Sequence, residues 1–144
     1  MIKELHKGLY EALGRKDIPL MPCDLQEPKE RPGLKIYILP KSNRLNDSVR
    51  FTDYDIMILY YAKDINDYYI EHYEIMEEFE ELLLGSIELE NGVFVELNEI
   101  EFEQDNDLLA IYTGTTIDTY RDTEIDDEVM EELELFINGT KSET

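Results

Sequence analysis

The segment 49–61, VRFTDYDIMILYY, most constrains how this chain can fold. It begins with alternating apolar and polar side chains, which is typical of a half-buried strand. From Ile56 to Tyr61 the alternation gives way to side chains that are apolar on both faces. We therefore expect the second half of this strand to lie at the centre of a sheet that is covered on both sides.

Two segments have helical patterning. In residues 2–13 apolar side chains recur at helical spacing, and Gly14 follows as the C-cap. A second helix is predicted from an N-cap at Asn66 or Asp67 through Leu84. Most of its surface is Glu with no Lys at i,i+4 spacing, so it must be stabilised by packing on the sheet. Its predicted apolar stripe is Tyr69, Tyr73, Met76, Phe79 and Leu83.

The remaining strands are predicted from alternation and from turn residues. Residues 17–33 carry four of the five prolines and read as an extended connection with a short strand near Leu20. A strand over 33–39 follows and ends at Pro40. Residues 40–48 are polar, and we expect them to form a loop that is mobile in the free subunit and ordered against a neighbour.

Two hairpins are predicted next. The first, over 87–97, turns at Asn91-Gly92, a pair that tolerates the positive φ values of a type I′ turn. The second turns at 104–107 and returns along 109–120, where Gly114 marks a bulge or a bend.

The C-terminal segment is ambiguous between helix and strand. A capping box at 123–126 favours a short helix over about 125–132, whereas 133–137 also alternates like a strand and stays open. We expect one α+β domain over 1–138 and a flexible C-terminal tail over 139–144.

The predicted fold class is α+β. A mostly antiparallel mixed sheet of about five or six strands packs against the N-terminal helix, one long central helix and a short C-terminal helix. The expected core is Leu5, Leu9, Ile56, Ile58, Tyr73, Met76, Phe79, Val95 and Ile111.

Charge is distributed unevenly along the chain. Residues 1–50 hold ten Lys/Arg and seven Asp/Glu, and residues 51–144 hold three and twenty-eight, so +3 and −25 sum to −22. Such a surface repels phosphate backbones, which argues against ordinary nucleic-acid binding. It is either a solvated acidic face or a surface that meets a basic partner.

The residue types that carry catalysis are sparse. His6 and His72 lie far apart on predicted helix surfaces, and Cys23 has no neighbour that would activate it. The run 105–107 (Asp-Asn-Asp) reads as a turn, since the rest of a calcium loop is missing. We expect no catalytic, cofactor-binding or metal site, no membrane span and no enzymatic activity, and the lone cysteine fits the cytoplasm.

Tyrosines cluster near the start of the central helix. Five of them fall within fourteen residues, and we expect at least two to be core and the remainder to suit a protein interface. They are Tyr60, Tyr61, Tyr68, Tyr69 and Tyr73.

The order of these elements resembles that of the tail terminator, or tail completion, proteins of tailed phages and phage-like elements of Gram-positive bacteria. The similar segments are RPGLKIYIL (31–39), RFTDYDIMILYY (50–61), the helix 67–84, the turn 90–92 and MEELEL (130–135). The second of these is similar to an Arg-aromatic-x-x-x-Asp-Ile-x-x-x-Tyr run of the family.

The resemblance implies a structural virion protein rather than an enzyme. It implies a hexameric ring that stops tail-tube polymerisation and offers a surface to the head connector. The implied partners are further copies of the chain, the tail tube protein and the head–tail connector. DNA would pass through the channel without specific binding, and the tail would assemble in the host bacterial cytoplasm.

A cyclic ring joins two different faces of each subunit, and the basic N-terminal third and the acidic remainder could supply them. The interface candidates are Lys29, Arg31, Lys35, Lys41, Arg44, Arg50, Tyr61 and Tyr68. An acidic inhibitor, DNA mimic or immunity-type protein that binds one basic partner is the alternative, because it would explain the charge without a ring.

Overall fold

The structure is a computed structural model that describes residues 1–15 and 17–120. The predicted short helix over 125–132, the open segment 133–137 and the predicted tail lie outside the described residues.

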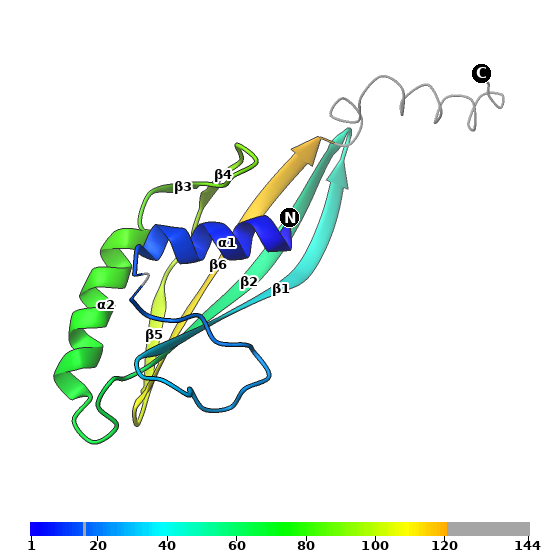
Figure 1. The fold of residues 1–144 in the computed structure, drawn as a ribbon. Coiled ribbons are helices and arrows are strands. Elements are labelled where there is room, and N and C mark those ends of the chain that lie inside the picture. The colour runs from blue at the N-terminus through cyan, green and yellow to red at the C-terminus, as the bar shows by residue number, and fades with distance from the viewer. Residues whose placement is uncertain (16, 121–144) are drawn as a thin grey trace. The chain divides into compact units, whose positions relative to one another are not determined.

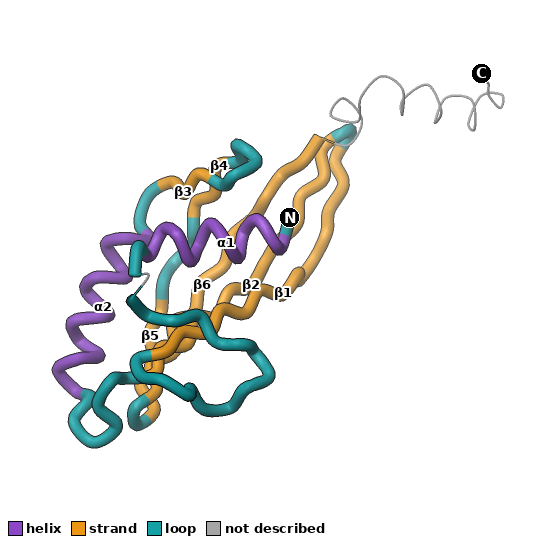
Figure 2. Tube along the Cα trace, in the orientation of Figure 1, coloured by secondary structure: helices purple, strands orange, loops and turns teal. Residues whose placement is uncertain are grey.

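The described chain is α+β, with two helices, a four-stranded sheet and a separate two-stranded sheet (Figure 2). The larger sheet has the order β1-β2-β6-β5, and β3 pairs with β4 alone, so the single five- or six-stranded sheet predicted from the sequence is wrong. Strand β5 pairs with β6 in antiparallel fashion, and so does β3 with β4. The elements are α1 (Ile2–Leu13), β1 (Gly33–Asn46), β2 (Val49–Tyr61), α2 (Tyr69–Leu83), β3 (Ser86–Glu88), β4 (Phe94–Glu96), β5 (Glu101–Asp105) and β6 (Leu108–Tyr120).

The chain divides into two compact units. The larger comprises residues 1–41 and 53–116 and contains both helices. The smaller comprises 42–52 and 117–144, and its described part is the β1–β2 hairpin tip with the end of β6.

The prediction for β2 is confirmed in its bounds and its central place in the sheet. All four side chains from Ile58 to Tyr61 are buried. Because side chains alternate along a strand, they pack on two different layers. On one side, the Tyr60 ring packs edge-on against the Phe79 ring of α2, with the ring centres 6.3 Å apart. On the other side, Leu59 and Tyr61 cluster with Met21 of the proline-rich segment.

Helix α1 matches its predicted bounds and ends at Gly14, whose φ of 63° is left-handed. It packs on α2 and β3 (Figure 1). A Cβ on Gly8 would lie 2.4 Å from the Leu89 side chain, so the missing side chain lets this part of the molecule approach α1 closely.

The N-cap of helix α2 is Tyr68, one to two residues later than predicted, and the helix buries a different stripe. Its buried residues are His72, Ile75, Phe79 and Leu83, whereas Tyr69 and Tyr73 are exposed and Met76 is only half-buried. The predicted and the observed stripes share Phe79 and Leu83, but they differ in the residues nearer the N-terminus of α2. A polar His takes the inward position there, because a backbone oxygen of Asp107 accepts a hydrogen bond from its Nε2.

Residues 40–48 are not the loop predicted from the sequence. Strand β1 continues through Pro40 to Asn46, and Asp47 turns the chain into β2 with a φ of 56°. Because β1 is an edge strand, a proline without an N–H is tolerated there. All residues of β1 from Leu39 onward are exposed, which explains why this polar stretch lacks the apolar signature of a strand.

The other turns lie where they were predicted. The β3–β4 turn differs in type: Leu89 N–H donates to Val93 O at 2.8 Å and only Gly92 has positive φ, so it is a three-residue loop rather than type I′. The β5–β6 turn places Asn106 at a φ of 54°. At Gly114 a Cβ would lie 2.9 Å from the Tyr54 carbonyl oxygen, so a close backbone approach explains this glycine. Near Leu20 the predicted strand is a single bridge to Leu34.

Candidate interaction surfaces

The described residues contain no group of three or more His, Cys, Asp and Glu side chains that could hold a metal ion. None of the helices in the described part of the chain is long and apolar enough to cross a membrane. Cys23 is exposed, and its sulfur lies 3.5 Å from the Ile36 carbonyl oxygen.

Several charged groups in the hollow beside α2 are engaged in structural pairs. This hollow, of about 760 Å³, is lined by both Arg15 and Glu78, whose guanidinium and carboxylate form two bonds of 2.9 Å. Arg15 also bonds Asp17 at 3.0 Å, and the hydrogen bond to Arg15 is the main reason that the pKa of Asp17 is lowered. These groups therefore fix the connection after α1 onto α2.

Glu71 organises the start of α2. Its carboxylate accepts hydrogen bonds from the Tyr60 hydroxyl at 2.5 Å and from the Lys63 N–H at 2.6 Å. Burial, and then the bond to Glu71, raise the pKa of Tyr60. The Asp64 carboxylate accepts from the N–H groups of residues 66 and 67 at 2.9 and 3.1 Å. This network positions the first turn of α2 and its tyrosines.

A second polar cluster joins four segments of the larger unit. The Arg31 guanidinium donates to Asp107 Oδ2 at 2.7 Å and to Ala62 O at 3.0 Å. His72 is fully buried, and its Nε2 lies 3.1 Å from Asp107 O. That bond places a proton on Nε2, and Nδ1 is buried without a hydrogen-bond partner among the described residues. The prediction that His72 lies on the helix surface is wrong.

The structure separates the predicted interface residues into buried and exposed groups. Lys35 and Tyr61 are buried, with the Lys35 ammonium 5.5 Å from the centre of the Tyr61 ring. Arg31 is engaged with Asp107, and Tyr68 is half-buried beside His72. The exposed members are Lys29, Lys41, Arg44 and Arg50.

The hairpin tip of the smaller unit carries two of these exposed arginines. A hollow of about 410 Å³ is lined by Asn43, Arg44, Leu45 and Arg50. The Thr52 hydroxyl donates to the Asn43 side chain at 2.7 Å, and the Arg44 guanidinium lies over the Phe51 ring at 5.8 Å. The tip is therefore a basic surface with an apolar side chain, Leu45, in it.

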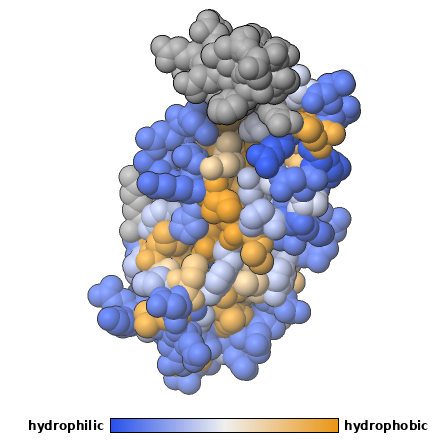
Figure 3. All heavy atoms as spheres, turned by 90° about the vertical axis from the view of Figure 1, so that its right-hand side faces the viewer, coloured by the Kyte–Doolittle hydropathy of each residue, from blue (hydrophilic) through white to orange (hydrophobic). Residues whose placement is uncertain are grey.

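An apolar groove lies on the sheet face that the proline-rich segment covers only in part. Its volume is about 330 Å³, and its lining is Tyr37, Leu39, Asp55, Ile56, Met57, Tyr112 and Thr113. Leu39 is 66% exposed and Tyr112 is 39% exposed. Apolar side chains also gather in a strip, bordered by hydrophilic ones, on the face shown in Figure 3.

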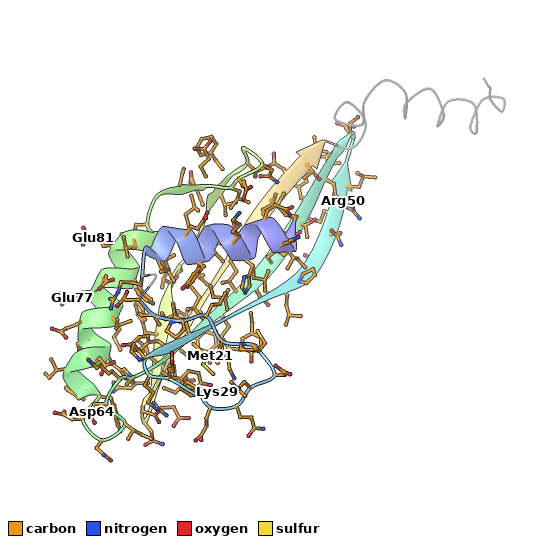
Figure 4. The ribbon with its side chains drawn as sticks, viewed as in Figure 1. Met21, Lys29, Arg50, Asp64, Glu77 and Glu81 are labelled. Atoms are coloured by element: carbon orange, nitrogen blue, oxygen red, sulfur yellow. The ribbon has the colours of Figure 1, made fainter. Side chains whose placement is uncertain are left out.

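The outer side of α2 is the second surface with exposed apolar side chains. Tyr69, Ile70 and Tyr73 are 56%, 63% and 48% exposed, and the two tyrosine rings pack edge-on at 4.9 Å. Glu77 and Glu81 project from the side of the same helix that faces away from the strands (Figure 4). The stripe predicted from the sequence places Tyr69 and Tyr73 in the core. Sequence analysis therefore did not identify this exposed surface.

A family model described as phage tail terminator protein matches residues 1–130 of this chain. No curated protein matches the chain.

Proposed function

This chain belongs to the phage tail terminator family, and we propose that it caps the tail tube as a hexameric ring. The family is structural, and membership makes the chain a component of a phage tail. In our proposal the ring stops polymerisation of the tube protein and presents its other side to the head–tail connector. The observation that carries this proposal is the family match over residues 1–130.

The chemistry of the described surface supports a structural rather than an enzymatic role. Several titratable groups in the hollow beside α2 are held in internal pairs, such as Arg15 with Glu78 and Tyr60 with Glu71. The net charge of −22 suits a ring through which DNA passes, because like charges form no ion pairs that retain phosphates.

We propose that the exposed basic residues of one subunit face acidic residues of the next. Lys41, Arg44 and Arg50 supply the basic side, and the Glu side chains of α2 are the acidic partners. Each exposed pair contributes only about 0–1 kcal/mol, so several must act together with apolar contact. Added salt should weaken assembly, because exposed charges are screened over about 10 Å at 0.1 M and about 3 Å at 1 M.

Light scattering across a salt series tests this proposal. The double variant Arg44→Glu with Arg50→Glu should abolish rings while leaving the fold intact, because both side chains are exposed. Lys3→Glu with Lys63→Glu is the matched control, since it changes the net charge equally at two other exposed positions.

The outcomes separate the mechanism from the function. A ring that is indifferent to salt and to the arginine variant would remove the electrostatic mechanism and keep the terminator. A protein that stays monomeric at tens of micromolar and low salt, with or without tube protein, would instead favour the acidic inhibitor or DNA mimic.

A further inference from the structure

The two exposed apolar surfaces of the larger unit lie on opposite sides of its sheet. Tyr60 points toward α2, where its ring meets His72 and Phe79. Met57 is three residues from Tyr60, so its side chain lies on the other face of β2, where it packs on the cluster of Met21 and Leu59. The groove therefore opens on the face that α2 does not cover, and the exposed side of α2 points away from it.

We infer that the groove of one subunit receives the outer side of α2 of a second copy. This inference rests on the proposed ring, and it names the two surfaces that meet. Surfaces on opposite sides of one unit cannot pair with each other within that unit. When they pair between copies, the contact is head-to-tail, which gives a ring where the rotation between copies closes and an open filament where it does not, rather than a two-fold dimer.

The shapes and chemistry of the two surfaces are complementary. Tyr69, Ile70 and Tyr73 project from one side of a helix, and the groove is a hollow lined by apolar and aromatic side chains, the arrangement of a helix bound in a groove. Tyrosine side chains combine a large apolar ring with a hydroxyl donor. The exposed Asp55 carboxylate in the groove can accept from those hydroxyls.

The start of α2 is held rigidly before any partner binds. The Tyr69 and Tyr73 hydroxyls lie 3.3 Å apart, and Glu71 between them anchors the helix to Tyr60. A surface that is already ordered loses little conformational freedom on association, which favours binding.

Charge is also complementary at the edge of the contact. Lys41 follows Leu39 by two residues on β1, so both side chains lie on the same side of that strand. Glu74 and Glu77 follow Tyr73 along α2, and both are exposed. An apolar centre with charged groups at its rim is the usual anatomy of a protein interface.

Cross-linking between copies tests which surfaces meet. In a Cys23→Ser background, which removes the chain's single cysteine, Leu39→Cys and Ile70→Cys are made as separate proteins. They are mixed, allowed to assemble and treated with a short bismaleimide. We expect a dimer band from the mixture and none from either protein alone, because a head-to-tail contact brings together one cysteine of each kind.

Two substitutions test whether the contact contributes to assembly. Leu39→Glu and Ile70→Glu should each weaken ring formation at least about tenfold, the scale of an interface anchor. Leu84→Glu is the matched control, because Leu84 is also 66% exposed and lies beyond the other end of α2. Unchanged thermal unfolding of all three would show that the fold is intact.

The result that would overturn the inference differs from the one that would overturn the proposed function. Rings seen by negative-stain microscopy without cross-linking in the mixture would reject these surfaces and keep the ring. Cross-linking of either single-cysteine protein with itself, as strong as in the mixture, would show a two-fold contact instead. Absence of any assembly, with or without tube protein, would reject both the ring and this interface.

Discussion

Replacing Phe79 with Ala should be among the most destabilising single changes in α2. The side chain is fully buried, and its ring meets Tyr60 edge-on at 6.3 Å. Phe→Ala substitutions in cores cost about 3–5 kcal/mol. Since domains are stable by about 5–15 kcal/mol, this loss is a large part of the total. With a urea m-value of about 2 kcal/mol/M, a loss of about 4 kcal/mol lowers the unfolding midpoint by about 2 M.

Tyr73→Ala is the comparison that gives this experiment its meaning. Tyr73 lies on the same helix but is 48% exposed, so its removal should cost less than about 1 kcal/mol. Urea melts of the two variants, with the m-value checked for two-state behaviour, measure the difference. A loss below about 1 kcal/mol for Phe79→Ala, or equal losses for the two variants, would refute the assignment of the buried side of α2.

Three further changes test other parts of the fold. Gly14→Ala should lower the free energy of unfolding by about 1 kcal/mol, because φ is 63° and no steric contact adds to the cost; a neutral result in urea melts would contradict the left-handed cap. Asp107→Ala should cost about 1–2 kcal/mol by removing the partner of the partly buried Arg31, and Asp107→Asn should cost nearly as much because it also removes the negative charge; unchanged melts for both variants would argue against the ion pair. Because the folded-state pKa of Tyr60 is raised, its contribution to stability is present below its ordinary pKa of about 10 and is lost as the pH rises above that value. The fall of the urea midpoint above about pH 10 should therefore be smaller in Tyr60→Phe, and an identical fall would contradict the buried environment of that hydroxyl.

The elements with strong local signals were predicted correctly from the sequence. The bounds of β2 follow from its run of β-forming residues, and its central place follows from side chains that are apolar on both faces. Helix α1 was found because its apolar spacing ends at a glycine in the C-cap position. In these segments local propensity and tertiary packing favour the same structure.

The errors have a common physical cause, which is that tertiary contacts outweighed hydrophobicity. His72 is buried with its Nε2 bonded to an oxygen of Asp107, 35 residues away, and no local pattern contains that partner. Tyr69 and Tyr73 were assigned to the core on hydrophobicity alone. The polar end of β1 pairs as a strand at the sheet edge although none of its side chains beyond Ile38 is buried.

The predicted interface shows the same limitation. Sequence charge identified the exposed Lys41, Arg44 and Arg50, but it could not distinguish them from Lys35, which is buried over the Tyr61 ring. The apolar groove was not predicted, because its lining comes from three strands that only the fold brings together. Alternation within a strand shows which of its side chains share a face. It does not show which other segments of the chain pack on that face.

Mass measurement in solution, followed by negative-stain microscopy of the same sample, tests the central claim most directly. We expect a ring of about 102 kDa, six times the 17.0 kDa chain, at low salt and tens of micromolar protein. Added to growing tail tubes, the ring should be seen at one end of each tube and should stop its elongation. A monomer at every concentration that leaves tube length unchanged would contradict the account.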